Sequence, residues 1–432
     1  MERKIVKDLI LWKDNPKRQP LLLQGARQVG KTYALLAFGK KHYKNVAYFN
    51  MEESKAIPAI FERDLNPERI VRELAAHNNQ TILPEATLII LDEIQACEQA
   101  LTSLKYFAEE APQYHVVAAG SLLGVAMKRE KFSFPVGKVD ILHLNPMDFE
   151  EFLWAVGRND LCALIRDAYE KYTPLSLHDA AMDMYKTYLA VGGMPRAVLE
   201  YSSNGDFDYV VVHQRTLNDS FVADMAKYAT PQETVRIMAA WASVPAQLAK
   251  ENRKFQYRFI KSGARAKDYE FALDWLKAAG MINQCVHVTE GKLPLAAFAE
   301  NEIFKVYMVD TGLLCSKMDI TANVVKHTPH SFDGFKGALA ENYIMQALVA
   351  NGIAPYYWTS QGKAEVDFIF QDRSGNIIPL EAKSAENVRS KSLRNYRDIY
   401  NPVYSVRVSA RNFGYENGIK SIPLYAMFCL IN

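Results

Sequence analysis

Residues 21–33 read LLLQGARQVGKTY, and this stretch decides the fold of the first part of the chain. An apolar run ends at Gly25, and Gly30, Lys31 and Thr32 follow after four residues, as in the phosphate-binding pattern G-x-x-x-x-G-K-[ST]. Glycines let the backbone turn so that successive N–H groups point at phosphate oxygens. Lys31 would reach the β- and γ-phosphates, and Thr32 would ligate Mg²⁺ at the start of a helix. We therefore predict an ATP site here, with a glycine-rich loop that binds nothing as the alternative. Its predicted nucleotide-binding residues are Gly25, Ala26, Arg27, Gln28, Val29, Gly30, Lys31, Thr32 and Tyr33.

A second motif lies about 60 residues after this loop, in TLIILDEIQ at residues 87–95. Four apolar residues, typical of a buried parallel strand, deliver Asp92 and Glu93 to the end of that strand. Asp92 would hold Mg²⁺, and Glu93 would polarise the water that attacks the phosphate. A strand that ends in two solvated acids is the alternative, but the position after a phosphate loop favours the catalytic interpretation.

Three further apolar runs, at residues 45–51, 115–120 and 139–144, read as strands of the same sheet. Together with the helix expected at 31–41, they predict an α/β core with a parallel sheet. Ser121 follows the middle run, where it would sense the γ-phosphate or cap a helix.

The length and composition of the chain limit the number of domains and the classes of protein to which it can belong. The chain has 432 residues, of which 49% are hydrophobic and 23% charged, and this size suits about two to four domains. The formal net charge of +2 demands no nucleic-acid partner, so any such surface must be local. Five widely spaced cysteines suggest neither a metal cluster nor a disulfide framework. No apolar stretch is long enough to span a bilayer, so we expect a cytoplasmic protein without a membrane partner.

Several motifs together resemble one family. GARQVGKT, LIILDEIQ, AAGSLLG, FPVGKVDILHLNPMDFEEFL and GGMPRAV are similar to the AAA+-type ATPases of a large prokaryotic family with a C-terminal domain of unknown function. The resemblance implies ATP and Mg²⁺ as cofactors and a homo-oligomer with sites between subunits. It also implies an arginine finger before the fifth strand, where Lys138 stands and Arg129 lies further back. A solvated basic face is the alternative for that segment. Arg196 resembles a second-sensor arginine, although a structural arginine after the Gly-Gly turn fits equally well.

The middle of the chain carries helical spacing and then a different pattern. The resemblance implies a small helical subdomain first. Helices expected at 233–241, 245–251 and 264–279, followed by a strand at 281–289 and a turn, give the order of a winged helix. Basic residues on and before the third helix would contact phosphates or form a solvated face. These residues are Lys254, Arg258, Lys261, Arg265 and Lys267.

The C-terminal part carries a third pattern. Expected strands at 364–370 (AEVDFIF) and 376–383 (NIIPLEAK) hold Asp367, Glu381 and Lys383, and an upstream helix holds Glu341. This set resembles the metal-dependent nuclease core named PD-(D/E)XK, although a chain of this size holds about one such linear match by chance. Asp367 and Glu381 would hold Mg²⁺, Lys383 would orient the attacking water, and Glu341 matches the acid of the first helix.

These patterns predict a P-loop AAA+ core at 1–157, a helical lid at 158–229, a winged-helix domain at 230–322 and a restriction-endonuclease-like α/β domain at 323–432. We expect an ATP-hydrolysing protein that couples ATP to the binding or cleavage of nucleic acid, DNA above all. One alternative is an ATP-driven switch whose C-terminal domain only docks a partner. Another is a signalling NTPase without a nucleic-acid partner.

Overall fold

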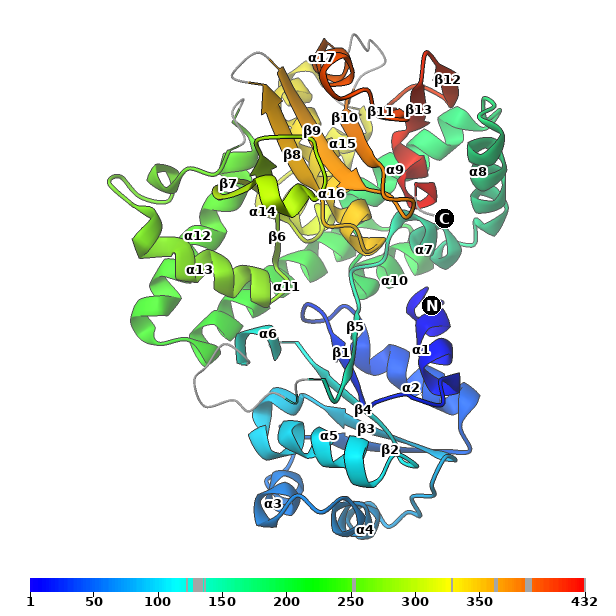
Figure 1. The fold of residues 1–432 in the computed structure, drawn as a ribbon, viewed down its shortest axis with the longest axis vertical. Coiled ribbons are helices and arrows are strands. Elements are labelled where there is room, and N and C mark those ends of the chain that lie inside the picture. The colour runs from blue at the N-terminus through cyan, green and yellow to red at the C-terminus, as the bar shows by residue number, and fades with distance from the viewer. Residues whose placement is uncertain are drawn as a thin grey trace. The chain divides into compact units, whose positions relative to one another are not determined.

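The computed structural model describes residues 1–121, 123–126, 135, 137–250, 254–327, 329–360, 364–384 and 391–430. The chain divides into two compact units (Figure 1). The first unit comprises Arg3–Asn145 with Ala278–Gly280, and the second comprises Met1–Glu2, Pro146–Lys277 and Met281–Asn432.

A five-stranded parallel sheet forms the centre of the first unit. Its strands are β1 (Leu21–Gln24), β2 (Asn45–Asn50), β3 (Thr87–Asp92), β4 (His115–Gly120) and β5 (Asp140–His143). They lie in the order β2-β3-β4-β1-β5, and every neighbouring pair is parallel. Strands β3 and β4 are buried over their full length because helices cover both faces of a parallel sheet. The parallel α/β core expected from the sequence is confirmed.

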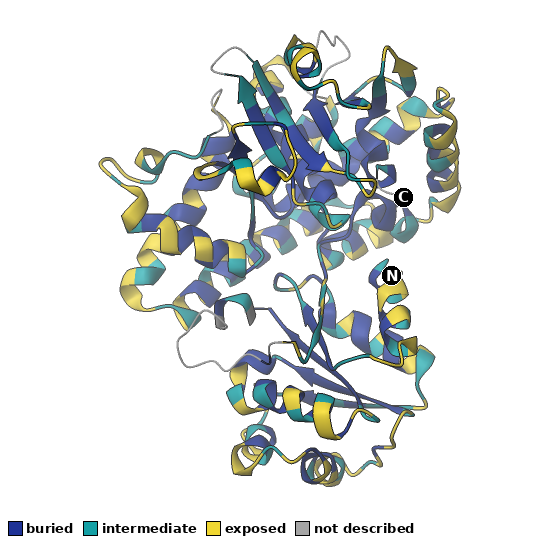
Figure 2. Cartoon of the chain, in the orientation of Figure 1, coloured by how far each residue is buried: buried dark blue, intermediate teal, exposed yellow. Residues whose placement is uncertain are grey.

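Helices pack on the two faces of this sheet. Leu22, Phe49 and Ile89 share one core with apolar residues of α3, α4 and α5, whereas α2 packs against β2, β3 and β4. Figure 2 shows β3 and β4 dark blue and exposed, yellow stretches on α3, α4 and α5. The helices of this part are α1 (Ile5–Asp14), α2 (Lys31–His42), α3 (Ala56–Arg63), α4 (Pro67–His77), α5 (Glu98–Glu110) and α6 (Leu123–Ala126).

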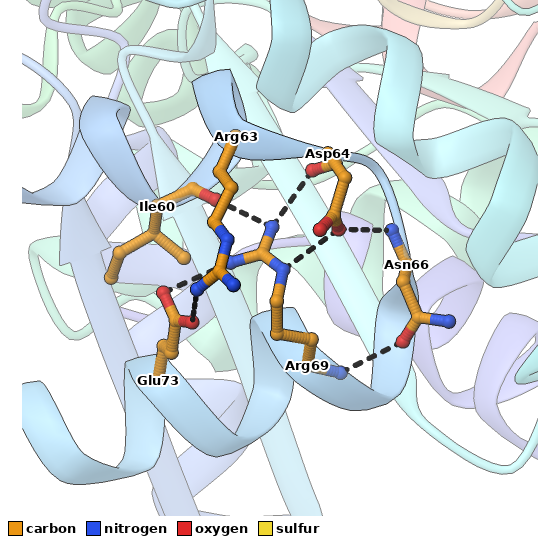
Figure 3. Close-up of polar contacts among 6 residues, drawn as sticks. All are labelled: Ile60, Arg63, Asp64, Asn66, Arg69 and Glu73. Atoms are coloured by element: carbon orange, nitrogen blue, oxygen red, sulfur yellow. Dashed lines mark hydrogen bonds and ion pairs between the residues drawn. The ribbon is translucent and has the colours of Figure 1, made fainter.

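A buried arginine fixes the connection between α3 and α4 (Figure 3). Arg69 on α4 donates hydrogen bonds to the Asp64 carboxylate at 2.7 Å and to the Ile60 carbonyl at 2.8 Å. Its guanidinium also pairs with Glu73, one turn further along α4, at 2.9 Å. The Asn66 side chain accepts from the Arg69 backbone N–H and caps the helix. The Arg69 side chain thus makes hydrogen bonds or ion pairs with residues of both helices and of the loop between them.

After β5, the chain forms a series of helices before it returns to β-strands. They are α7 (Phe149–Ala155), α8 (Asn159–Lys171), α9 (His178–Val191), α10 (Pro195–Asn204), α11 (Phe207–Tyr228), α12 (Pro231–Leu248) and α13 (Ala266–Ala278). The two helices expected at 233–241 and 245–251 are one helix, α12, with Pro245 inside it. Pro245 has no N–H to donate to the carbonyl oxygen of Trp241, so α12 continues through this position without one of its hydrogen bonds. A 3₁₀ turn, Tyr257–Phe259, precedes α13.

An eight-stranded mixed sheet dominates the second unit. Its strands are β6 (Ile282–Val288), β7 (Ala299–Met308), β8 (Tyr356–Ser360), β9 (Ala364–Gln371), β10 (Ile377–Ala382), β11 (Ser405–Ser409), β12 (Gly414–Glu416) and β13 (Ile419–Pro423). They lie in the order β12-β13-β11-β10-β9-β8-β6-β7. The β6–β7 hairpin, expected as the wing of a separate domain, continues this sheet because β6 pairs in parallel with β8. The expected boundary between residues 322 and 323 therefore crosses one continuous sheet.

Helices cover the two faces of this sheet as well. α16 (Asp333–Ala350) contacts β6, β7 and β10, and α17 (Lys391–Tyr400) contacts β9 and β10. Tyr396 of α17 packs with Trp358 and Val366, so the alternation of side chains along β9 places Asp367 on the opposite face, toward α16. Between the hairpin and α16 lie α14 (Thr311–Lys317) and α15 (Ala322–His327).

Within the described parts of the chain, no helix combines the length and the apolar character needed to cross a membrane. The five cysteines, all described and all buried, form no disulfide.

Candidate functional site

The phosphate loop joins β1 to α2 as the sequence predicts. Gly25 has a φ of +156°, and a Cβ atom built on it would lie 2.2 Å from the Leu144 carbonyl oxygen. Gly30 has a φ of +90° and immediately precedes α2. A side chain at Gly25 would collide with fixed backbone, so glycine is required there.

Lys31 is folded back into the loop that it follows. Its ammonium donates to the carbonyl oxygens of Gly25 at 3.0 Å and Ala26 at 2.9 Å. Burial lowers the pKa of Lys31 to about 8, although the nearby carboxylates of Glu93 and Asp92 act in the opposite direction. A buried ammonium that is held by backbone carbonyl oxygens is suited to receive an anion such as a phosphate.

The Asp92 carboxylate, at the end of β3, accepts hydrogen bonds from three donors. The Thr32 hydroxyl donates to its Oδ2 at 2.6 Å, and the Tyr48 hydroxyl donates to the same oxygen at 3.0 Å. The Glu93 backbone N–H donates to Oδ1 at 3.0 Å. A hydroxyl and a carboxylate side by side are oxygen ligands of the kind that Mg²⁺ prefers, so these residues fit the metal that the motif implies. Tyr48 on β2 is a member of this site that the motifs did not indicate.

Glu93 is held next to Asp92 in an uncommon backbone conformation. Its φ is +50°, in the left-handed region, and its side chain is half-buried. The Gln95 amide donates to Glu93 Oε2 at 2.6 Å. The carboxylate predicted to polarise water is thus positioned by a side chain two residues away.

Arg3 supports the loop from the start of the chain. It is 6% exposed, and its guanidinium donates to the carbonyl oxygens of Val29 at 2.8 Å and Asn145 at 2.7 Å. These bonds connect the phosphate loop to the residue two positions after β5. No motif indicates Arg3, because its partners lie 26 and 142 positions away.

The C-terminal residues predicted from the sequence also meet. The Asp367 carboxylate on β9 accepts from the Ala382 backbone N–H at 2.8 Å, between Glu381 and Lys383. Lys383 pairs with Glu381 Oε1 at 2.8 Å. Glu381 is 3% exposed, and its second oxygen is buried without a hydrogen-bond partner. The three residues therefore form one cluster at the end of β10.

Glu341 lies on α16 and has partners that the sequence did not indicate. The Tyr307 hydroxyl donates to Glu341 Oε2 at 3.3 Å, and the Lys305 ammonium lies 3.9 Å from the same oxygen. Lys305 also pairs with Glu365 at 2.6 Å. Lys305 and Tyr307 stand on β7, in the segment expected to belong to a different domain. Among the described residues, no group of three or more histidine, cysteine, aspartate or glutamate side chains is arranged to hold a metal ion.

Comparison with known families separates the chain into three parts. The family model described as an AAA domain matches residues 17–153, which include the phosphate loop, Asp92 and Glu93. The chain therefore carries an AAA domain. Two families described as domains of unknown function, DUF8612 and DUF4143, match residues 182–323 and 336–427. The AAA domain is an ATPase-type P-loop domain, as the motifs predict, whereas these matches do not bear on the nuclease-like interpretation.

Solved structures resemble the chain only distantly. The Walker-type ATPase PABY2304 of Pyrococcus abyssi is 15% identical, over 73% of this chain and 95% of that one, with a TM-score of 0.45. The Aeropyrum pernix ORC2 protein is 14% identical over 75% and 92%, with a TM-score of 0.34. The Thermotoga maritima RuvB Holliday junction branch migration motor is 16% identical over 65% and 89%, with a TM-score of 0.32. No curated protein is a significant match.

The remaining residues predicted for the ATP site differ in their surroundings. Ser121 is buried directly after β4, where the motif predicts it. Lys138 is partly exposed and pairs with Glu109 at 3.0 Å. Arg129 lies outside the described residues. Arg196 is exposed in the first turn of α10, in the second unit. Its role as a second sensor stays a prediction.

Proposed function

We propose that this protein hydrolyses ATP in a Mg²⁺-dependent reaction at its AAA domain. The observation that carries the proposal is the position of Asp92, which accepts from Thr32 at 2.6 Å and lies directly before Glu93. The carboxylates of Asp92 and Glu93 both act to raise the pKa of Lys31 in the phosphate loop. The four residue types that a P-loop ATPase needs thus lie within one site.

Each of these residues has a distinct task in the proposed reaction. The Lys31 ammonium would leave the carbonyl oxygens of Gly25 and Ala26 and pair with the β- and γ-phosphates. Thr32 and Asp92 would hold Mg²⁺, which offsets phosphate charge when it is bound. The Glu93 carboxylate would orient a water molecule in line with the γ-phosphate and accept its proton. The Gln95 amide at 2.6 Å limits where that carboxylate can point.

Phosphate release by the purified full chain tests this proposal. Release should require both ATP and Mg²⁺ and should stop when the metal is chelated. An Asp92→Asn variant should need a higher Mg²⁺ concentration, because it keeps the shape but loses one ligand charge. Equal release with and without a divalent metal would contradict the proposal.

We also propose that the site is completed in a homo-oligomer, as the resemblance to AAA+ ATPases implies. Arg129 and Lys138 are the candidates for a cation that reaches the γ-phosphate of a neighbouring copy. The Lys138 side chain is 41% exposed despite its pair with Glu109, and an exposed pair of this kind is weak enough to exchange.

A second proposed function concerns the C-terminal acids. We propose that the second unit binds nucleic acid and that Asp367, Glu381 and Lys383 cleave it with a divalent metal. The supporting observation is the buried, unpartnered oxygen of Glu381 beside Asp367 and Lys383, because an oxygen left without a partner in such a cluster is a ready metal ligand. A docking module that binds DNA or protein without cleavage is the competing proposal.

A basic surface on the same unit would provide phosphate contacts. Arg258, Lys261, Arg265 and Lys267 are exposed on and before α13. Phe259 is 38% exposed and lies 5.1 Å from the Arg258 guanidinium, so a base could stack beside a cation there. Incubation of the protein with plasmid and single-stranded DNA, with Mg²⁺ or Mn²⁺ and with or without ATP, separates cleavage from binding alone.

A further inference from the structure

A cavity of about 560 Å³ lies in the second unit, with α9 and α16 forming much of its wall. Met182, Tyr185 and Leu189 line it along one face of α9, and Leu339 and Ala340 line it from α16. Its volume falls within the range of roughly 300–1,000 Å³ that is usual for small-molecule sites. Neither of the two proposed functions uses this cavity.

The inner surface of the cavity is apolar. Its deeply buried lining residues come from helices and 3₁₀ turns that are far apart in the sequence. These residues are Leu189, Val325, Phe332, Leu339, Ala340 and Leu424. An apolar group that entered the cavity would leave water for this surface, which is favourable in free energy.

Tyr185 adds an unsatisfied hydrogen-bonding group to this apolar lining. Its ring packs edge-on against the Tyr343 ring, with the ring centroids 4.9 Å apart. The Tyr185 hydroxyl is buried and has no hydrogen-bond partner in the part of the chain that the structure describes. Burial raises its pKa, so the hydroxyl keeps its proton and can donate. Because a buried polar group without a partner is costly, a ligand oxygen that accepted this bond would gain affinity.

Two lysines also line the cavity, Lys186 from α9 and Lys336 from α16. The Lys186 side chain is 31% exposed, and its partner Asp183, at 3.9 Å, is 79% exposed, so this pair is weak. Lys336 is half-buried and has no ion-pair partner among the described residues. The acids that line the cavity, Asp179 and Asp183, are both exposed, so water screens their charges more than those of the lysines.

We propose that this cavity binds a small amphipathic carboxylate, with its apolar body against the buried lining and its head group at Lys336 and Lys186. A ligand oxygen would accept the hydrogen bond that Tyr185 offers. A carboxylate fits better than a phosphate monoester, because Lys186 is already partly neutralised by Asp183 and a monoester carries nearly two negative charges. The described lining includes no residue of the ATP site and none of the predicted nuclease acids, so the proposal depends on neither function.

Calorimetric titration of the full chain with decanoate, decylamine and decanol tests the proposal. The three probes share one apolar chain and differ in the charge of the head group, and all are used below the concentration at which they form micelles. We expect one decanoate molecule to bind per chain, at least about tenfold more tightly than decylamine or decanol, because only the carboxylate pairs with the lysines.

Two substitutions test the polar contacts. Lys336→Met should weaken decanoate binding about tenfold and leave decanol binding unchanged. The matched control is Lys326→Met, because Lys326 is also half-buried but lies over the Phe207 ring and does not line the cavity. Tyr185→Phe should bind decanoate more weakly and yet unfold at no lower temperature than wild type, since the lost hydroxyl has no partner in the ligand-free protein.

Ala340→Phe tests the location, because the larger side chain would fill the cavity and should abolish decanoate binding. If Ala340→Phe does not fold, Met182→Trp, which fills the cavity from a half-buried position on α9, is judged by the same criterion. Three results would overturn the proposal. They are no binding of decanoate by wild type, binding of decylamine as tight as that of decanoate, and undiminished decanoate binding by a folded, cavity-filled variant.

Discussion

The Thr32 hydroxyl donates a hydrogen bond of 2.6 Å to the Asp92 carboxylate across 60 positions of the chain. The bond brings together the two residues that the phosphate-loop and strand motifs assign to the metal. Both lie at the carboxyl ends of parallel strands or at the start of the following helix, where loops of α/β sheets gather functional groups.

Replacement of Lys31 by alanine should abolish tight ATP binding. The change removes the ammonium buried in the phosphate loop, and we expect ATP hydrolysis to fall roughly 10²–10³-fold or more. Binding of a fluorescent ATP analogue and phosphate release measure the two effects. Lys40→Ala, an exposed lysine on the same helix, should behave like wild type. Wild-type hydrolysis by Lys31→Ala would remove the basis of the proposed function.

ATP affinity should fall as the pH rises above 8. The pKa of Lys31 is lowered by burial to about 8 in the nucleotide-free protein, so the ammonium loses its proton above that pH. The phosphates need the protonated form, and binding therefore requires uptake of a proton there. We expect the dissociation constant to rise by up to about tenfold per pH unit above 8. A Lys31→Arg variant that still binds ATP should lack this dependence, because arginine stays protonated.

Replacement of Glu93 by glutamine should separate ATP binding from hydrolysis. Glutamine keeps the shape and the contact with Gln95 but cannot accept a proton from water. The variant should retain ATP and elute from a sizing column as a larger species than the nucleotide-free protein. Glu110→Gln, an exposed acid at the end of α5, serves as the control. A monomer under every nucleotide condition, together with full wild-type turnover, would exclude a cation supplied by a neighbouring copy.

Replacement of Arg3 by alanine should weaken both the fold and the ATP site. The change leaves the carbonyl oxygens of Val29 and Asn145 without the Arg3 donors, and we expect the free energy of unfolding to fall by about 2–4 kcal/mol. Chemical denaturation measures the loss, and ATP affinity should fall because Val29 belongs to the phosphate loop. Lys7→Ala, exposed on α1, should change neither. An unaltered ATP affinity in folded Arg3→Ala would mean that Arg3 only stabilises the unit.

Cleavage by the second unit should depend on Asp367 and Lys383 and leave ATP hydrolysis intact. Removal of Asp367 takes away one proposed metal ligand, and removal of Lys383 takes away the cation that would offset charge on the phosphate. Each alanine variant should lose about 100-fold or more of the nuclease rate, and Glu341→Ala should lose less. Glu416→Ala, an exposed acid on β12, is the control. Cleavage that persists in Asp367→Ala would point to another site.

The sequence predicts the P-loop fold around the proposed ATP site because its motifs are local. Gly25, Gly30, Lys31 and Thr32 lie in one strand–loop–helix segment, and a continuous apolar run identifies the strand before Asp92. Arg3 and Tyr48 are different, because they reach the site only after residues far apart in the chain have come together. A hydrogen bond between positions 3 and 145 leaves no pattern in a single sequence.

The second unit is harder to predict, because strands that lie far apart in the chain pair to form its sheet. The spacing of Asp367, Glu381 and Lys383 along two neighbouring strands correctly indicates that they meet. By contrast, β6 pairs with β8, with Val286 opposite Tyr356, and nothing in the sequence of either strand indicates which strand it pairs with. The sequence therefore assigns Lys305 and Glu365 to different predicted domains, and it carries no signal for the ion pair between them. The two helices expected at 233–241 and 245–251 are likewise one helix, α12, because the chain stays helical through Pro245.

The β6–β8 pairing has a consequence for how this chain can be inherited. The match to DUF8612 contains β6 and β7, and the match to DUF4143 contains β8 to β13, so the two regions share a single sheet. A recombination event that transferred only one of them would leave β6 or β8 as an open edge, which other chains can join. Gene fusions and exchanges should therefore move the two regions together.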